Sequence, residues 1–407
     1  MSIGQPSYLE RFQEKVTYLE GQQLKRKLRL AQSACAPRMT IDSKEVLTFC
    51  SNDYLGLANH PLLIQALGEG ASIYGSGSGA SHLINGHSAA HALLESKLAD
   101  WQSAYIPDPR ALFFCTGYMA NLAVVTSLCA FGKKTSLFSD SLNHASLIDG
   151  IRLASRQFEV DVQVYPHLDL QNLEQKLQLD SQKQDPSDVR LIITDGVFSM
   201  DGDLALLPEL LALAEKYDAL LLVDDAHGFG ILGDDGHGIL QACGLKSDRL
   251  VYIATLGKAA GISGAFIVAH QSIIEWMVQS ARPYIYSTAT PPSIAHTALK
   301  SLELIESSEG HGRRNHLNKL INRLKTELNS TQWELLSSPT AIQPLIIGSN
   351  EDAIEIGLGL EKHGIYVPAI RPPTVPKGTA RLRITLSASH TDADLDELIH
   401  AIKILSQ

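Results

Sequence analysis

Hydrophobic and polar positions divide the chain into a long α/β region and a shorter C-terminal region with a different pattern. Seven short apolar runs lie between residues 56 and 290, mostly separated by helical stretches: 111–115, 135–139, 162–165, 190–194, 219–223, 250–254 and 264–268. Such runs are typical of strands buried on both faces of a mainly parallel sheet. The last two runs are too close for a helical crossover, so the pattern predicts that they form an antiparallel pair.

The pattern changes after Pro291 and Pro292. The downstream spacing predicts six elements: a long helix over 295–329, a strand at 341–348, a helix, a strand near 365–370, a strand at 381–386 and a final helix from 391. These elements indicate a smaller α/β domain.

The N-terminal region predicts one amphipathic helix over residues 8–29. Tyr8, Leu9, Phe12, Val16 and Leu19 recur there at steps of three and four residues. We therefore expect three parts: an N-terminal helix and arm (1–55), a large domain (56–290) and a small C-terminal α/β domain (291–407).

Composition and charge exclude several classes of protein. With 44% hydrophobic and 19% charged residues, the chain is neither disordered nor a coiled coil. Its 34 Lys and Arg against 44 Asp and Glu give a net charge of -10, which disfavours nucleic-acid binding. Five cysteines without a CxxC pair indicate neither a disulfide framework nor a zinc knuckle. The N-terminus lacks a signal-peptide core and no apolar run reaches the ~18 residues of a membrane helix, so we expect a soluble cytoplasmic protein.

A basic cluster interrupts the acidic chain at Lys25, Arg26, Lys27 and Arg29. Charge runs of this kind usually form a solvated surface. The alternative is a docking patch for an anionic substrate, and the residues alone leave both open.

Lys258 is the most informative single residue. It follows an apolar strand in a glycine-containing turn and, apart from His270 and the phenol of Tyr252, is the only ionisable side chain between Arg249 and Glu275. Desolvation there would lower the pKa of its amine and make it a nucleophile or a Schiff-base partner. An ordinary exposed turn lysine is the alternative.

Two other predicted strand ends carry polar groups. Asp224, Asp225 and His227 follow one buried run, whereas Gly117 and Tyr118 lie between a strand and the start of a helix. Ligands bind at the carboxyl ends of parallel strands, and a helix N-terminus presents free N–H groups to a phosphate. A lysine, a carboxylate, a histidine and a phosphate cradle together match the needs of pyridoxal 5′-phosphate (PLP). No HExxH or similar spacing is present, so we expect no metal site.

Several longer stretches resemble one enzyme family. They are SNDYLGL (51–57), GSGSGASHLINGHS (75–88), SDSLNHASLIDG (139–150), GVFSMDGD (196–203), VDDAHGFG (223–230), TLGK (255–258) and YSTATPP (286–292). The chain resembles the α-oxoamine synthases, a branch of the fold-type-I PLP-dependent transferases, from residue 51 almost to the C-terminus. The fold this implies is a large α/β domain with a mainly parallel sheet plus a smaller C-terminal α/β domain.

The resemblance implies a role for each matching cofactor residue. Lys258 forms the covalent Schiff base and acts as the catalytic base, Asp224 pairs with the pyridine nitrogen, and His227 contacts the phenolic oxygen. His144 stacks on the ring. Further cofactor contacts are Gly117, Tyr118, Ser199 and Thr255, and Ser287 and Thr288 of the neighbouring subunit in a homodimer with shared sites.

The same resemblance implies which residues contact the substrates. Arg383 grips the carboxylate of the amino acid, Asn52 and His144 contact the substrate, and Arg26 aligns with a substrate-binding arginine. Thr374, in the run Arg371–Thr374, is a candidate contact of the acyl group. The residues alone favour a surface arginine for Arg383, whereas for Thr374 they leave a turn residue between prolines and an acyl contact equally open.

The run at 371–374 and the AIQPLIIG stretch at 341–348 are similar to the branch that joins L-alanine to a pimeloyl thioester in biotin biosynthesis. We expect pimeloyl-CoA or a pimeloyl-carrier protein as donor, and 8-amino-7-oxononanoate, CO₂ and free thiol as products. The alternatives are a glycine C-acyltransferase of the 2-amino-3-ketobutyrate CoA ligase type and a non-catalytic PLP-binding regulator. Three residues depart from the family pattern: Asp195, Phe229 and His87.

Overall fold

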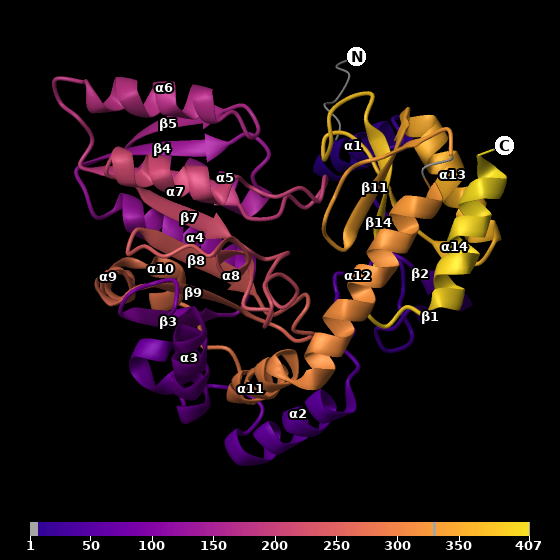
Figure 1. The fold of residues 1–407 in the computed structure, drawn as a ribbon, viewed down its shortest axis with the longest axis horizontal. Helices are drawn as coiled ribbons and strands as arrows, with labels where there is room; N and C mark the ends of the chain where they lie inside the picture. Colours follow the sequence, from indigo (N-terminus) through magenta and orange to yellow (C-terminus); the bar gives the residue numbers. More distant parts are fainter. Residues whose placement is uncertain (1–6, 329–330, 407) are drawn as a thin grey trace.

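The structure, a computed structural model, describes residues 7–328 and 331–406. The first six residues of the predicted arm, residue 329 of the predicted helix 295–329 and Gln407 lie outside this part. Figure 1 shows two lobes, one built on a large sheet and one carrying the C-terminal strands and helices, with α11 (Pro292–Glu306) and α12 (Ser308–Leu328) between them.

The large lobe is built on a seven-stranded sheet. Its strand order is β3 (Pro109–Phe114), β9 (Ala265–His270), β8 (Leu250–Thr255), β7 (Leu220–Asp224), β6 (Val189–Asp195), β4 (Lys134–Asp140) and β5 (Glu159–Tyr165). Each predicted apolar run overlaps one of these strands. The last five strands in this order are parallel, and β8 pairs antiparallel with β9 as predicted. The additional antiparallel pair of β3 with β9 was not predicted.

Helices cover both faces of this sheet. Along β7, Leu221 and Val223 face one core together with α3, α6, α7 and α8, whereas Leu222 faces the other with α4, α5, α9 and α10. The helices of this lobe are α2 (Pro61–Tyr74), α3 (Ala89–Gln102), α4 (Gly117–Cys129), α5 (Ala145–Gln157), α6 (Leu170–Ser181), α7 (Leu207–Lys216), α8 (Ile239–Cys243), α9 (Gln271–Ser280) and α10 (Arg282–Ile285). The edge strand β5 departs most from burial on both faces: its Val164 is 54% exposed.

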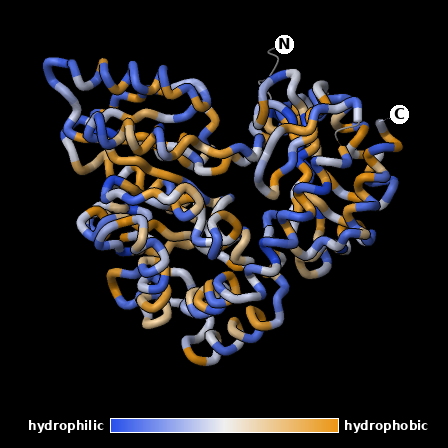
Figure 2. The backbone as a smooth tube through the Cα atoms, viewed as in Figure 1, coloured by the Kyte–Doolittle hydropathy of each residue, from blue (hydrophilic) through white to orange (hydrophobic). Residues whose placement is uncertain are grey.

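Hydropathy follows this layering. In Figure 2 hydrophobic segments run through the interior of both lobes, and the outermost helix, α6, is largely hydrophilic. Within the described residues, no helix is both long and apolar enough to cross a membrane.

The second lobe joins both ends of the chain. One sheet has the order β10 (Glu334–Leu335), β11 (Ile342–Gly348), β14 (Ala380–Thr385) and β13 (Ala369–Ile370). The other has the order β1 (Arg38–Ile41), β2 (Lys44–Thr48) and β12 (Ile365–Tyr366). Helices α12, α13 (Asn350–Lys362) and α14 (Asp392–Leu405) complete it. Because β2 pairs with β12, the predicted N-terminal arm is part of this lobe. Helix α11, in contrast, packs against α2 and α3 of the large lobe. The boundaries at residues 55 and 290 stay predictions.

Three predicted elements were wrong in extent. The helix predicted over 8–29 is α1 (Tyr8–Gly21), because Gln23 has a φ of 56° that no helix continues through. The helix predicted over 295–329 is two helices, since Ser307 is extended and its hydroxyl accepts the Gly310 N–H at the start of α12. A Cβ at Gly310 would lie 2.2 Å from the Ile305 carbonyl, so only glycine permits this tight junction. The strand near 365–370 is two short strands in different sheets.

Candidate active site

The carboxyl ends of β6, β7 and β8 surround a cavity of about 190 Å³. The N-termini of α4 and α5 close its other sides. It is lined by Gly117, Tyr118, Asn121, His144, Ser146, Asp195, Val197, Asp224, Ala226, His227, Thr255 and Lys258. The strand ends that the sequence singled out therefore meet in one place, as parallel strands require.

Lys258 is held in this cavity by His227. The Lys258 Nζ lies 2.8 Å from His227 Nε2. Burial lowers the pKa of Lys258 to about 8, although the nearby carboxylates of Asp224 and Asp195 oppose this effect. Burial also lowers the pKa of His227 well below its usual range, and the Lys258 charge adds to this. The pair thus offers an amine that can lose its proton near neutral pH and a neutral imidazole.

Asp224 presents its carboxylate at the end of β7, held by two donors. Asn121 Nδ2 donates to Asp224 Oδ2 at 2.6 Å, and the Ala226 N–H donates to Oδ1 at 3.0 Å. The next residue, Asp225, points away from the cavity and accepts the Ile239 N–H and the Tyr252 hydroxyl. Asp224 is therefore the carboxylate available to a ligand, and Asp225 is structural.

His144 begins α5 on the opposite wall. Its Nδ1 lies 2.6 Å from the Ser146 hydroxyl, and its backbone N–H donates to Asp195 Oδ1 at 3.2 Å. Burial raises the pKa of Asp195 well above its usual range, and the nearby Asp224 charge raises it further. Asp195, one of the departures from the family pattern, therefore positions His144 through its backbone.

The cavity provides the groups that a cofactor with a phosphate and a pyridine ring needs. The first turn of α4, which starts at Gly117, presents backbone N–H groups at a helix N-terminus. Asn121 Oδ1 is buried on the wall and has no hydrogen-bond partner in the described part of the chain. A buried unpaired polar atom is unfavourable unless a ligand or water satisfies it, so the residues fit PLP.

A second cavity of about 710 Å³ adjoins the first. His144, His227 and Lys258 line both cavities. The larger one adds, from both lobes, Asn52, Ser141, Leu142, Asn143, Ala145, Ile148, Ser199, Met200, Pro373, Thr374, Val375, Pro376 and Arg383. A molecule in this space would reach the amine of Lys258.

Arg383, on β14, is buried and oriented by three bonds. Its Nε donates to the Ser199 carbonyl at 2.6 Å, and its Nη1 donates to Asn52 Oδ1 at 3.3 Å and to the Thr385 hydroxyl at 3.1 Å. These bonds fix the plane of the guanidinium, which lines the larger cavity. The guanidinium is therefore a preorganised anion site.

Tyr54 connects the two sides of the site. Its hydroxyl lies 2.5 Å from His227 Nδ1 and donates to Asn52 Oδ1 at 3.2 Å. Tyr54 is fully buried. A chain of hydrogen bonds thus runs from Arg383 through Asn52 and Tyr54 to His227 and Lys258.

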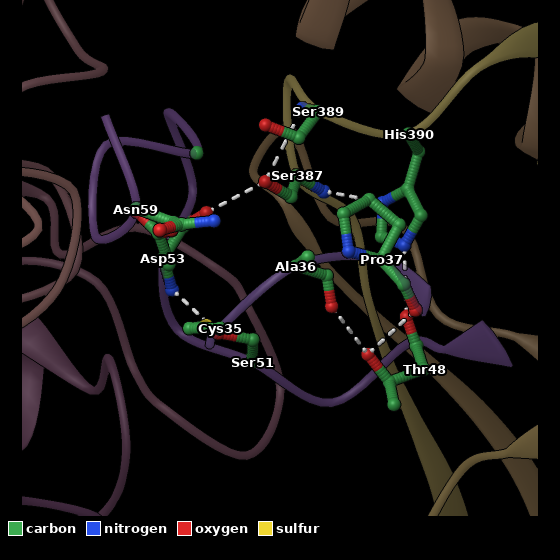
Figure 3. A pocket seen from close by; sticks show the side chains of 11 residues that line it. Cys35, Ala36, Pro37, Thr48, Ser51, Asp53, Asn59, Ser387, Ser389 and His390 are labelled. Carbon is green, nitrogen blue, oxygen red and sulfur yellow. Dashed lines mark hydrogen bonds between the residues drawn. The ribbon is translucent and has the colours of Figure 1, made fainter. Parts of the chain in front are cut away.

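A separate polar cavity of about 150 Å³ lies behind the segment that carries Asn52 and Tyr54 (Figure 3). Its polar groups bond one another: Ser387 Oγ donates to the Asp53 carbonyl at 2.7 Å, and His390 Nε2 donates to the Thr48 carbonyl at 2.8 Å. These bonds fasten the 51–54 segment to the segment after β14. The cavity therefore supports the positions of Asn52 and Tyr54.

Comparisons with known proteins identify the family. The aminotransferase class I and II family model matches residues 44–402. The 8-amino-7-oxononanoate synthase of Janthinobacterium sp. (strain Marseille) is 55% identical over 395 residues, 97% of this chain and 98% of the relative. The chain belongs to the 8-amino-7-oxononanoate synthases. The synthase of Cupriavidus taiwanensis is 56% identical, with 93% of each chain covered.

Solved structures agree with this assignment. Serine palmitoyltransferase from S. paucimobilis, solved with a bound PLP–myriocin compound, is 28% identical with a TM-score of 0.87, and 98% of each chain is covered. The 8-amino-7-oxononanoate synthase of Francisella tularensis is 31% identical with a TM-score of 0.74, covering 89% of this chain and 97% of that chain. The predicted fold class, a fold-type-I transferase, is confirmed.

Some predicted site residues of this 8-amino-7-oxononanoate synthase lie outside the first cavity. Ser199 and Thr374 line the larger cavity. Ser287 and the exposed Thr288 line neither cavity of their own chain, and Arg26 is exposed and also lines neither. The roles assigned to these residues stay predictions.

The basic cluster that contains Arg26 is partly paired. Lys25 lies 3.1 Å from Glu20, and Arg29 forms ion pairs with Asp42 and Glu361.

The other two departures from the family pattern, Phe229 and His87, line neither of the two cavities. Phe229 packs in the core with its ring centroid 5.1 Å from that of Phe266, and His87 sits before α3.

Sequence analysis missed Asn121, Ser146 and Tyr54 as site residues. Asn121 lies one helical turn after Gly117, so its place on the cavity wall follows from a helix starting at Gly117. Tyr54 lies within the SNDYLGL stretch, but its contact with His227 spans 173 positions. Periodicity gives no signal for such a contact.

Proposed function

We propose that this chain condenses L-alanine with a pimeloyl thioester to give 8-amino-7-oxononanoate, CO₂ and free thiol, with PLP as cofactor. The observation that carries the proposal is the shared wall of the two cavities, where His144, His227 and Lys258 face both. One cavity has the groups for the cofactor, and the other has an arginine for a carboxylate and room for an acyl chain.

The residues of the smaller cavity would hold the cofactor. Lys258 would bind it covalently through Nζ, Asp224 would pair with its pyridine nitrogen, and His227 would contact its phenolic oxygen. Its phosphate would lie at the first turn of α4, beside Gly117 and Tyr118. Bound PLP supplies an electron sink for the electron pair left at the α-carbon of the amino acid.

The residues of the larger cavity would hold and orient the substrates. Arg383 would grip the L-alanine carboxylate, as its planar fork allows. The Lys258 amine, with a pKa of about 8, would take the proton from the α-carbon and later return one. Asn52 and Thr374 would line the path of the acyl chain. Tyr54 would keep the His227 ring in place during these steps.

The proposal is tested by thiol release from the purified enzyme loaded with PLP. We expect release with L-alanine plus pimeloyl-CoA, and little with glycine plus acetyl-CoA. Preference for glycine plus acetyl-CoA would contradict the proposed substrates and indicate a glycine C-acyltransferase. A parallel assay with pimeloyl-carrier protein identifies the donor, and absence of release with every donor would contradict the activity.

Arg26 and the neighbouring basic residues are proposed to guide the acyl donor through its phosphates. In that case Arg26→Gln should raise the KM for pimeloyl-CoA at low salt, and the difference should shrink at high salt. An unchanged KM would indicate that the basic cluster is only a solvated surface. Arg156→Gln, at an exposed arginine of α5, removes the same charge elsewhere and is the matched control.

The active unit is proposed to be a homodimer. Its support is exposed apolar surface: on α1, Tyr8, Leu9 and Phe12 are 76%, 80% and 70% exposed, and Ile84 and Tyr286 are 78% and 71% exposed. Exposed apolar surface of this kind marks interaction sites.

Since each of the five cysteines is a free thiol, we also propose a cytoplasmic location.

Size-exclusion chromatography with light scattering measures the molar mass of the protein and so tests the dimer. The mass of a monomer at micromolar concentration would refute it. Mixed dimers test the shared site. Lys258→Ala and Ser287→Ala/Thr288→Ala chains should each be weak alone. When mixed, they should regain part of the activity, because one of the two sites then has intact residues from both chains.

A further inference from the structure

Three histidines gather outside both substrate cavities. His82 begins the short turn His82–Gly86, His87 follows it, and His91 lies in the first turn of α3. Their ring centroids are 5.0 Å apart for His82 and His91, 5.3 Å for His82 and His87, and 5.6 Å for His87 and His91. One ring nitrogen from each lies within 4.8 Å of the other two.

Their surroundings keep these imidazoles neutral. Burial lowers the pKa of all three, and to about 3 for His82, where the neighbouring rings add their repulsion. A neutral imidazole has one nitrogen with a free electron pair, which is the form that binds metal ions. The Nδ1 atoms of His82 and His87 face each other at 3.0 Å, so a proton or a metal ion must lie between them.

His91 has an outer partner of the kind that metal-binding histidines use, and a carboxylate lies near the outer nitrogen of His87. His91 Nε2 lies 2.8 Å from the Thr290 carbonyl and donates to it, which leaves the unprotonated Nδ1 as the ligand atom of a neutral ring. His87 Nε2 lies 3.7 Å from Glu95 Oε2. Ligating histidines usually donate their second N–H to a carbonyl or a carboxylate, which fixes the tautomer and the ring orientation.

Glu95 is a buried acid beside this cluster. Its carboxylate accepts the Phe113 N–H at 2.9 Å, and burial raises its pKa to about 7. A cation bound by the histidines would favour its charged form. No residue of the proposed reaction uses Glu95 or the three histidines.

We propose that His82, His87 and His91 form a binding site for a divalent transition-metal ion, Zn²⁺ in particular. Three imidazoles with one open position are a common Zn²⁺ ligand set, whereas Mg²⁺ and Ca²⁺ prefer oxygen ligands. The ion enters beside His87, whose side chain is 33% exposed.

Binding requires a small local rearrangement. Tetrahedral coordination at Zn–N distances of about 2.1 Å places the nitrogens roughly 3.4 Å apart. The ligand nitrogens lie up to 4.8 Å apart, so the two that are farthest apart must move closer together. His91 Nδ1 also gives up the Ser88 N–H, which it accepts at 3.0 Å, and its contact with the Ser88 hydroxyl at 3.1 Å. Because Thr290 is tied to His91 and Ser81 bridges to Thr288, the bound ion would fasten this turn to the 288–290 segment.

The test uses the untagged holoenzyme without amino acid substrate, titrated with ZnCl₂ in a calorimeter. We expect one Zn²⁺ per chain, and a rise in melting temperature on addition of Zn²⁺. His87→Gln, at the most exposed of the three, should weaken binding at least about tenfold and remove the rise. Glu95→Gln should weaken binding by about 10- to 100-fold without removing a ligand. His400→Gln, at an exposed histidine outside the cluster, should bind as the parent does.

Three results would overturn the proposal. They are absence of Zn²⁺ binding to the parent enzyme, equal binding by His87→Gln, and equal loss of binding in His400→Gln. Co²⁺ gives an independent readout, because its visible absorption should report tetrahedral nitrogen ligation in the parent and not in His87→Gln. These experiments do not measure thiol release, so the proposed metal site is tested independently of the proposed function.

Discussion

His167 links two acidic residues next to the substrate cavity, and its charge should make stability depend on pH. Its Nδ1 lies 3.0 Å from Asp140 and its Nε2 2.8 Å from Asp203. Burial alone would lower the pKa of the ring, but hydrogen bonds to both carboxylates outweigh it and raise the pKa to about 9. The imidazolium therefore joins the end of β4 to the segment that carries Ser199.

The sign of the pH dependence follows from that pKa. A group whose pKa is higher in the folded than in the unfolded protein stabilises the fold fully below its unfolded value, here 6.5. The contribution is lost as pH rises through the folded value of about 9. The difference between 6.5 and 9 corresponds to at most about 3–4 kcal/mol. Because the side chain is 23% exposed, solvent screening reduces this to about 1–2 kcal/mol.

The perturbation is His167→Gln, which keeps a hydrogen-bonding side chain but cannot carry the charge. Urea unfolding at pH 6 should show the variant less stable than the parent by about 1–2 kcal/mol. By pH 9.5 this difference should shrink to half or less. His400→Gln should follow the parent at every pH. A stability difference that stays constant from pH 6 to 9.5 would refute the reasoning, as would a variant equal to the parent at pH 6.

The remaining predictions concern the reaction centre. Lys258→Ala should lower kcat by at least about 10²-fold because it removes the proton acceptor; absorbance should show PLP no longer covalently held, and near-normal turnover would contradict the assignment. Arg383→Lys should raise the KM for L-alanine about tenfold or more with a smaller change in kcat, since Lys cannot form the planar fork; an unchanged KM would exclude the carboxylate role. Tyr54→Phe removes the hydroxyl 2.5 Å from His227 Nδ1. It should lower kcat/KM by about tenfold, for a lost hydrogen bond of roughly 1.4 kcal/mol, and should shift the PLP absorbance, whereas an unshifted spectrum would contradict this effect.

The large sheet and the core of the site could be predicted because both depend on local pattern. Apolar runs predicted the strands, and the polar residue directly after a run, such as Asp224 at the end of β7, lies at the sheet edge where parallel strands end. Lys258 and Gly117 follow the same rule. These predictions needed no knowledge of which strands are neighbours, because all carboxyl ends of parallel strands share one edge.

Features that depend on distant contacts could not be predicted in this way. The antiparallel β3–β9 pair joins segments more than 150 positions apart, and nothing in either run specifies the partner. Arg383 enters the site only because the second lobe folds against the first, and the residues alone favoured a surface arginine. The helix ends at Gly21 and Ser307 depend on single caps, which hydrophobic periodicity does not record.

Asn121 shows what signal could have been used. In the apolar helix α4 it is the only amide, it is 1% exposed, and its Nδ2 bonds Asp224. A polar residue at a buried helical position has to be satisfied, so its presence at one turn from a predicted phosphate site points into that site. The amide is also the right partner electrostatically. Asn121 holds Asp224 Oδ2 through a neutral donor, so it orients the carboxylate toward a pyridine nitrogen without adding a positive charge beside it.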